Sequence, residues 1–210
     1  DEPGWVTERY IKDFARDLPA YEYLTLQTDP AQADCDGLIK AWQAVGETFL
    51  LEAWLGTTFF DYFGEAREGG LAQTIYDLSE RESKLRALQE RYDDWMVRLA
   101  RSICEKTSVE SLFIGCSWSC NSLIGPRLWR RWGQPTIARV VEEVHRHGRL
   151  LHVHFHGKCM ETVADFARLS VDCVCPFERP PGGDVRGLRD LKTVARRLKG
   201  KTTMNGNIHT

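Results

Sequence analysis

The histidines of the segment 150–157, Leu-Leu-His-Val-His-Phe-His-Gly, have the spacing of metal ligands. Side chains alternate between the two faces of a β-strand, so His152, His154 and His156 would share one face. Three imidazoles on one face of a buried strand are costly unless they are hydrogen-bonded or bound to a metal ion. We interpret His154 and His156 as a metal-binding pair, and His152, deeper in the strand, as a packed or supporting residue. The alternative is that these rings bond only main chain or carboxylates in a polar interior.

A carboxylate follows the next predicted strand. The stretch 171–178 reads Val-Asp-Cys-Val-Cys-Pro-Phe-Glu, so Glu178 would lie beyond the carboxyl end of the strand, where parallel α/β proteins place active-site groups. Glu178 is therefore a candidate metal ligand and a candidate catalytic acid or base. A salt bridge with Arg179 is the alternative. Cys173 and Cys175 share one face of the strand, and free cysteine commonly packs as a small apolar residue.

Polar side chains also follow two other predicted strands. Trp118 and Asn121 lie in the loop after the strand at 111–114, and Asn205 and Asn207 lie where the last strand becomes a loop. These four residues are candidates for binding a polar substrate. Asn-Gly is also a common turn sequence, which is the alternative for the two C-terminal asparagines.

Short apolar strands that alternate with helices must position these groups. We expect strands at 23–27, 48–54, 111–114, 150–155, 171–175 and 202–205. We expect helices at 6–18, 35–45, 58–63, 80–106, 135–147, 160–169 and 185–198. The helix at 80–106 is the best defined, because Ser79 and Glu82 have the spacing of a capping box and apolar residues then recur every three or four positions. The alternation predicts a parallel sheet covered by helices, either an open doubly wound sheet or a (β/α)8 barrel.

Composition narrows the class of protein. The chain has 210 residues, 42% of them hydrophobic, with a formal net charge of −2. These values predict one globular domain over 1–210, without the basic field of a nucleic-acid-binding protein or the apolar run of a membrane span. The seven cysteines are odd in number and dispersed. We therefore expect reduced thiols in a cytoplasmic protein.

Four segments of the sequence form a recognisable series. They are Leu-Ile-Gly-Pro-Arg-Leu-Trp-Arg-Arg-Trp at 123–132, His-Arg-His-Gly at 145–148 after Pro135, Val-His-Phe-His-Gly at 153–157, and Met-Asn-Gly-Asn-Ile-His at 204–209. In this order they resemble motifs of the uroporphyrinogen decarboxylase superfamily. The resemblance implies a TIM-type (β/α)8 barrel. Longer members of that family have further barrel elements on both sides of the matched part, so we expect a partial barrel of about six β/α units.

The resemblance also implies an enzyme, from one of two branches. Corrinoid-dependent methyltransferases bind zinc through a His-x-Cys motif, whose His maps onto His154 and whose Cys maps onto His156. The change to His keeps a metal-binding group but alters its charge and softness. This branch implies zinc-assisted methyl transfer involving a corrinoid and a small thiol or methylated substrate, with Glu178 nearby. Its implied partners are a small-molecule substrate and a corrinoid protein, and a homodimer is compatible with the sequence.

Other functions remain open at this point. The second branch of the family, the decarboxylases of porphyrin biosynthesis, acts on uroporphyrinogen as metal-free lyases. A non-catalytic protein that binds a tetrapyrrole or corrinoid on the same barrel is a further alternative. Zinc amidohydrolases also use His-x-His in a barrel, normally on the first strand and with additional His and Asp ligands.

Overall fold

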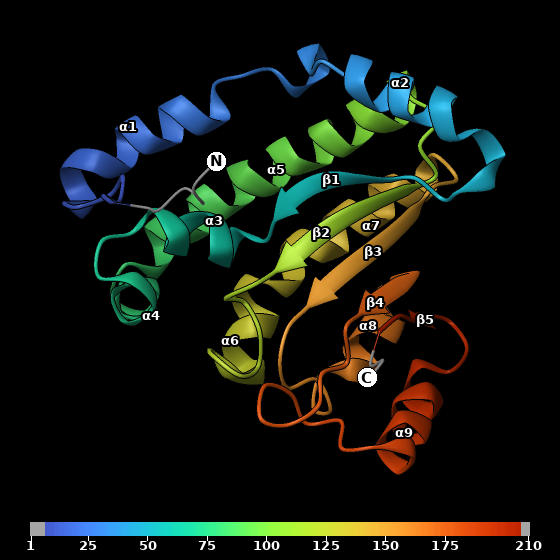
Figure 1. Cartoon of the computed structure of the whole chain (residues 1–210). Helices are drawn as coiled ribbons and strands as arrows, with labels where there is room; N and C mark the ends of the chain where they lie inside the picture. Colours follow the sequence, from blue (N-terminus) through green and yellow to red (C-terminus); the bar gives the residue numbers. More distant parts are fainter. Residues whose placement is uncertain (1–6, 207–210) are drawn as a thin grey trace.

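The computed structural model describes residues 7–206 and contains one parallel β-sheet with helices packed against it (Figure 1). The strands are β1 (Glu52–Thr57), β2 (Ser111–Cys116), β3 (Leu150–Phe155), β4 (Cys173–Cys175) and β5 (Thr203–Met204). The α-helices are α1 (Phe14–Leu26), α2 (Asp36–Val45), α3 (Phe59–Ala66), α4 (Gly70–Glu80), α5 (Glu82–Lys106), α6 (Gly125–Trp132), α7 (Gln134–Arg146), α8 (Val163–Leu169) and α9 (Leu188–Leu198). Two 3₁₀ turns, η1 (Pro30–Gln32) and η2 (Gly46–Thr48), flank α2.

The strands follow one another across the sheet in the order of the sequence. The order is β1-β2-β3-β4-β5 and every pair is parallel. A doubly wound sheet reverses its strand order at a switch point, whereas a barrel wall keeps the sequential order. The structure therefore confirms the predicted α/β class and is consistent with part of a TIM-type barrel. Five strands lie in residues 7–206, and within these residues the sheet is not closed.

The two faces of the sheet differ in what covers them. Helices α5, α7 and α8 pack on one face (Figure 1), where Leu55 and Val153 are buried and Phe155 meets Phe166 of α8 edge to face. The residues between these point to the other face, and Trp54 on that side is 57% exposed. His154 lies on this second face, because it alternates with Val153 along β3. Of the candidate metal ligands, His154 therefore lies on the face of the sheet opposite these helices.

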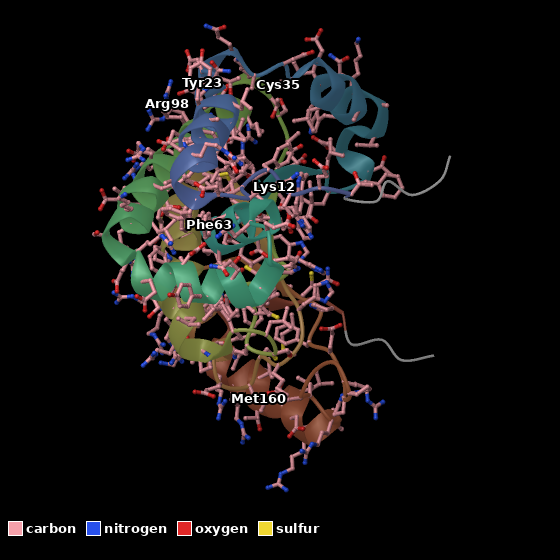
Figure 2. All side chains as sticks on the ribbon, turned by 90° about the vertical axis from the view of Figure 1, so that its left-hand side faces the viewer. Lys12, Tyr23, Cys35, Phe63, Arg98 and Met160 are labelled. Atoms are coloured by element: carbon pink, nitrogen blue, oxygen red, sulfur yellow. The ribbon has the colours of Figure 1, made fainter. Side chains whose placement is uncertain are left out.

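The strand predicted at 23–27 is wrong. Most of it belongs to helix α1, which begins where the side chain of Asp13 accepts a hydrogen bond from Arg16 N. The apolar residues Phe14, Leu18 and Tyr21 recur at helical spacing and pack on the core, and this packing overrides the strand propensity of the following Tyr-Leu-Thr-Leu. Helix α1 runs beside α5, so the exposed Tyr23 lies near Arg98 at the outer surface (Figure 2).

The predicted capping box is also wrong. Ser79 lies inside helix α4, which the sequence did not indicate, and only Arg81 separates α4 from α5. A residue within a helix cannot cap the next one, so α5 begins at Glu82 without a side-chain cap. The other elements appear within a few residues of their expected positions. The helix expected at 6–18 is found instead at 14–26, as α1. Residue 6, where the expected helix begins, lies outside the described part of the chain.

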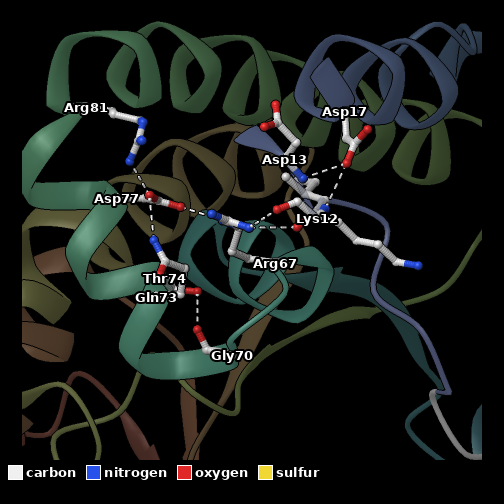
Figure 3. Close-up of polar contacts among 10 residues, drawn as sticks. Lys12, Asp13, Asp17, Arg67, Gly70, Gln73, Thr74, Asp77 and Arg81 are labelled. Atoms are coloured by element: carbon white, nitrogen blue, oxygen red, sulfur yellow. Dashed lines mark hydrogen bonds and ion pairs between the residues drawn. The ribbon is translucent and has the colours of Figure 1, made fainter. Parts of the chain in front are cut away.

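A buried ion pair between Arg67 and Asp77 connects α4 to the N-terminal segment at residues 11–12 (Figure 3). Arg67 donates to Asp77 through Nε at 2.5 Å and to the carbonyl groups of Ile11 and Lys12 through Nη1 at 2.9 Å. Asp77 also accepts hydrogen bonds from Arg81 and, at 3.0 Å, from Gln73. The side chain of Asp77 is 0% exposed and that of Arg67 is 9% exposed, so the pair is desolvated but fully bonded.

Asp93 of α5 is a buried carboxyl group whose protonation affects stability. It is 2% exposed and accepts a hydrogen bond of 2.6 Å from Thr136 Oγ1 of α7. Burial raises the pKa of Asp93 to about 6. Because the unfolded chain has an ordinary aspartate pKa near 3.9, the folded state binds this proton more tightly, and the contribution of the group to stability falls as the pH rises from about 4 through 6.

We expect Asp93→Asn to increase the free energy of unfolding by about 2–3 kcal/mol at about pH 7.5, because asparagine keeps the acceptor for Thr136 without a buried charge. At about pH 4 the parent carboxyl group is protonated in the folded state, so the two proteins should differ little. Denaturant unfolding at both pH values measures the effect. An equal difference at the two pH values would contradict this assignment.

Within residues 7–206, none of the helices combines the length and the apolar character that a bilayer span requires.

Candidate active site

The rings of His154 and His156 meet at the carboxyl end of β3. His154 is the last residue but one of the strand and pairs in register with Cys175 of β4, while His156 follows the end of the strand. The two Nε2 atoms are 2.7 Å apart, and the rings lie edge to face with centroids 4.3 Å apart. The spacing of two residues thus brings two ring nitrogens to one point.

The outer nitrogen of each ring has its own partner. His154 Nδ1 lies 3.2 Å from Cys175 Sγ, and His156 Nδ1 lies 3.3 Å from Glu178 Oε2. The same Glu178 oxygen accepts the backbone N–H of Gly157. Cys175, His154, His156 and Glu178 therefore form one continuous chain of hydrogen bonds from β4 to the loop after it.

The loop after β4 turns sharply so that Glu178 faces the end of β3. Phe177 has a φ of 54°, a conformation that non-glycine residues rarely adopt, and its buried side chain is 2% exposed. Gly183 then passes so close to the backbone of Glu178 that a Cβ at this position would overlap the Glu178 carbonyl group. Glycine is required at position 183 by this close approach of backbone to backbone.

Gly157, which follows β3, is a second position in the site where the backbone requires glycine. Its φ is 74°, and a Cβ would overlap the side chain of Ser122.

We expect Gly157→Ala to lower the free energy of unfolding by about 2–4 kcal/mol, because a left-handed residue costs about 1–2 kcal/mol and the overlap adds to it. Gly148 is the matched control, since its φ is 67° and nothing lies within 4 Å of the position that a Cβ would take. Equal losses for Gly157→Ala and Gly148→Ala in denaturant unfolding would exclude the steric contribution of Ser122.

The environment of His154 and of the two cysteines of β4 favours the neutral form of each of these side chains. Burial, and then the neighbouring His156, lower the pKa of His154, so this imidazole is unprotonated at neutral pH. Burial raises the pKa of Cys175 to about 11 and that of Cys173 to about 12, so both thiols are protonated. A neutral imidazole is the form that binds metal ions.

The geometry fits a metal ion held by two imidazoles. Nitrogens bound at 2.0–2.1 Å to a tetrahedral ion lie about 3.3 Å apart, so the 2.7 Å contact must open by about 0.6 Å. The side chain of His156 is 45% exposed and has room to move. Metal-binding histidines usually hold a carboxylate or similar acceptor at their other nitrogen, as both rings do here. Among residues 7–206 no group of three or more His, Cys, Asp or Glu side chains is arranged to hold an ion.

Glu178 and His152 have specific places relative to this pair. Glu178 lies at the Nδ1 side of His156, away from the point where the two Nε2 atoms meet. His152 Nδ1 lies 3.0 Å from both carboxylate oxygens of Glu52 on β1, and the ring is 5% exposed. His152 is therefore a packed residue whose ring is hydrogen-bonded to Glu52.

The three candidate substrate-binding residues that the structure describes lie in different surroundings. Trp118 packs against α3, where a Cβ on Gly64 would lie 3.1 Å from its ring. Asn121 donates a hydrogen bond of 3.0 Å to Thr162 Oγ1. Asn205 lines a cavity of about 390 Å³ on the open face of the sheet, together with His152. Asn207 lies outside the described residues.

Two polar residues of this region, Cys175 and Asp61, were not identified from the sequence as members of the site. Cys175 was expected to pack as an apolar residue, but it contacts His154 through the register of β3 and β4. Asp61 is 0% exposed and accepts hydrogen bonds from Thr58 and from Ser119, which fixes the loop that follows β2. The spacing Thr-x-x-Asp at 58–61 is a helix-start pattern that could have marked Asp61, whereas no local pattern marks Cys175.

Comparison with known proteins supports the fold. No family model matches the sequence, and no curated protein matches it. The chain is similar in structure to a methyltransferase from Methanosarcina mazei. The TM-score is 0.70 at 12% sequence identity, and the match covers 99% of this chain and 57% of that one. The likeness shows a shared fold, and this chain spans a little over half the length of the methyltransferase.

Proposed function

We propose that this chain belongs to an enzyme of the uroporphyrinogen decarboxylase superfamily that transfers a methyl group, with zinc, between a corrinoid and a small thiol or methylated substrate. The observation that carries the proposal is the pair of Nε2 atoms of His154 and His156, which face one point at the carboxyl end of β3. Barrel enzymes place their active sites at this end of the strands. The shared fold with a methyltransferase supports methyl transfer as the reaction class.

The residues of the site have distinct roles in this proposal. Zinc, when bound, would act as a Lewis acid that lowers the pKa of a substrate thiol. His154 and His156 would hold it through Nε2. Glu178 orients His156 through its contact with Nδ1. The side chain of Glu178 is 31% exposed, so its carboxylate can also accept the proton that the thiol releases.

The transfer balances without an oxidant or reductant. The bond between the methyl carbon and the cobalt of a methylcorrinoid breaks, and its electron pair stays on cobalt. A lone pair of the substrate sulfur forms the new sulfur–carbon bond. The thiol proton passes to Glu178 and then to solvent. The partner required by this reaction is a corrinoid protein that delivers the methyl group.

The test is demethylation of methylcobalamin by a small thiol, 2-mercaptoethanol, followed by the absorbance of the corrinoid. We expect the zinc-loaded protein to accelerate the reaction, and His154→Ala to reduce the rate at least about 100-fold (about 2.7 kcal/mol). No acceleration by the zinc-loaded protein would contradict the proposal. Metal-independent loss of carboxylate from uroporphyrinogen would replace it with the decarboxylase alternative.

A further inference from the structure

Cys175 contacts the metal-binding pair proposed above, although its sequence position predicted only apolar packing. It is 8% exposed on β4 and lies opposite His154 in the parallel register. Its Sγ is 3.2 Å from His154 Nδ1. Cys173, two residues earlier on the same face of the strand, lies opposite His152 instead. The two cysteines therefore share one face of the strand but differ in which histidine they accompany, and Cys173 is less buried than Cys175.

The proton positions of the two rings follow from the geometry. If both Nε2 atoms bind one ion, both Nε2 lone pairs must point at it, so each ring carries its proton on Nδ1. The His156 Nδ1–H then points at Glu178 Oε2, and the His154 Nδ1–H points at Cys175 Sγ. Each ligand thus has one acceptor that selects its tautomer, a carboxylate for one ring and a sulfur for the other.

We infer that Cys175 is a positioning residue, which accepts the Nδ1 proton of His154 and so presents His154 Nε2 to a metal ion. The inference rests on the proposed function, and it assigns to a thiol the place that a carboxylate or carbonyl oxygen usually fills. Sγ does not itself bind the ion, because it lies on the side of the His154 ring away from the Nε2 pair.

The inference is tested by measuring zinc affinity of the full chain by competition with a chromophoric chelator. Loss of an outer partner of a metal-bound histidine weakens binding about 10- to 100-fold, and we expect this for Cys175→Ala. Cys175→Ser keeps an acceptor and should bind zinc within about threefold of the parent protein. Cys173→Ala is the matched control and should leave the affinity unchanged. The thermal midpoint of each variant without zinc reports any general loss of structure.

Four outcomes would overturn the inference. Unchanged affinity in Cys175→Ala would show that the thiol does not act on His154. Equal weakening in Cys173→Ala would show a general loosening of β4, and failure of Cys175→Ser to restore affinity would exclude the acceptor role. Cobalt(II) in place of zinc gives a thiolate charge-transfer band in the near ultraviolet when sulfur is a direct ligand, and such a band, lost in Cys175→Ser, would make Cys175 a ligand. If the parent protein binds no zinc, the proposed function fails instead.

Discussion

Replacing His154 by alanine should lower the affinity of the chain for zinc by at least about 100-fold, more than removal of any outer partner of the site. The described residues offer two converging ring nitrogens, and the variant leaves His156 alone. Binding by one imidazole lacks the chelate geometry that holds an ion in place. Metal content after dialysis and competition with a chelator measure the loss.

The control for this prediction is another histidine with a polar partner. His145 is bonded to Asp172 at 2.8 Å and belongs to α7, away from the Nε2 pair. His145→Ala should keep the parent affinity for zinc. Retention of a full equivalent of zinc by His154→Ala, with an unchanged affinity, would show that the ion binds elsewhere.

Replacing Asp77 by alanine should lower the free energy of unfolding by about 3–5 kcal/mol, the largest expected effect on stability. Asp77 is fully buried, and its loss leaves the guanidinium group of Arg67 desolvated without a counterion. The hydrogen bonds of Arg67 to Ile11 and Lys12 also depend on this orientation, so the N-terminal segment should detach from α4. Denaturant unfolding of the purified variant measures the change.

An exposed ion pair provides the comparison. Asp94 pairs with Arg139, and their side chains are 62% and 42% exposed. Exposed pairs contribute about 0–1 kcal/mol, so Asp94→Ala should have little effect on unfolding. A similar small effect for Asp77→Ala would mean that Arg67 finds water when its partner is removed, and that the buried pair does not fasten the N-terminal segment.

Much of the fold was predictable because it depends on local periodicity. The apolar run of β3 and the stripe along α5, from Leu85 to Ile103, mark their elements without tertiary information. The segment 23–27 failed because residues with strand propensity continue a helix whose apolar side packs on the core. Helix α4 was missed because its N-terminal residue is Gly70 and only Arg81 separates its last residue from α5.

The contacts of the candidate site that arise within one strand could be predicted from the sequence. Those that join separate strands could not. The spacing of His154 and His156 follows from the pleat, and the sequence is enough to place them together. Glu178 was placed by its position after a strand. The contact of Cys175 with His154, and that of Glu52 with His152 across 100 residues of sequence, require the parallel register of separate strands. Register between distant strands is set by the packed sheet, which a single sequence does not encode locally.

X-ray absorption at the zinc edge of the purified, zinc-loaded protein tests the two-imidazole metal site most directly. We predict one equivalent of zinc whose first shell contains two imidazole nitrogens at about 2.0–2.1 Å, both lost in a His154→Ala, His156→Ala double variant. Protein that binds no zinc, or zinc with a first shell unchanged by the double variant, would contradict this site.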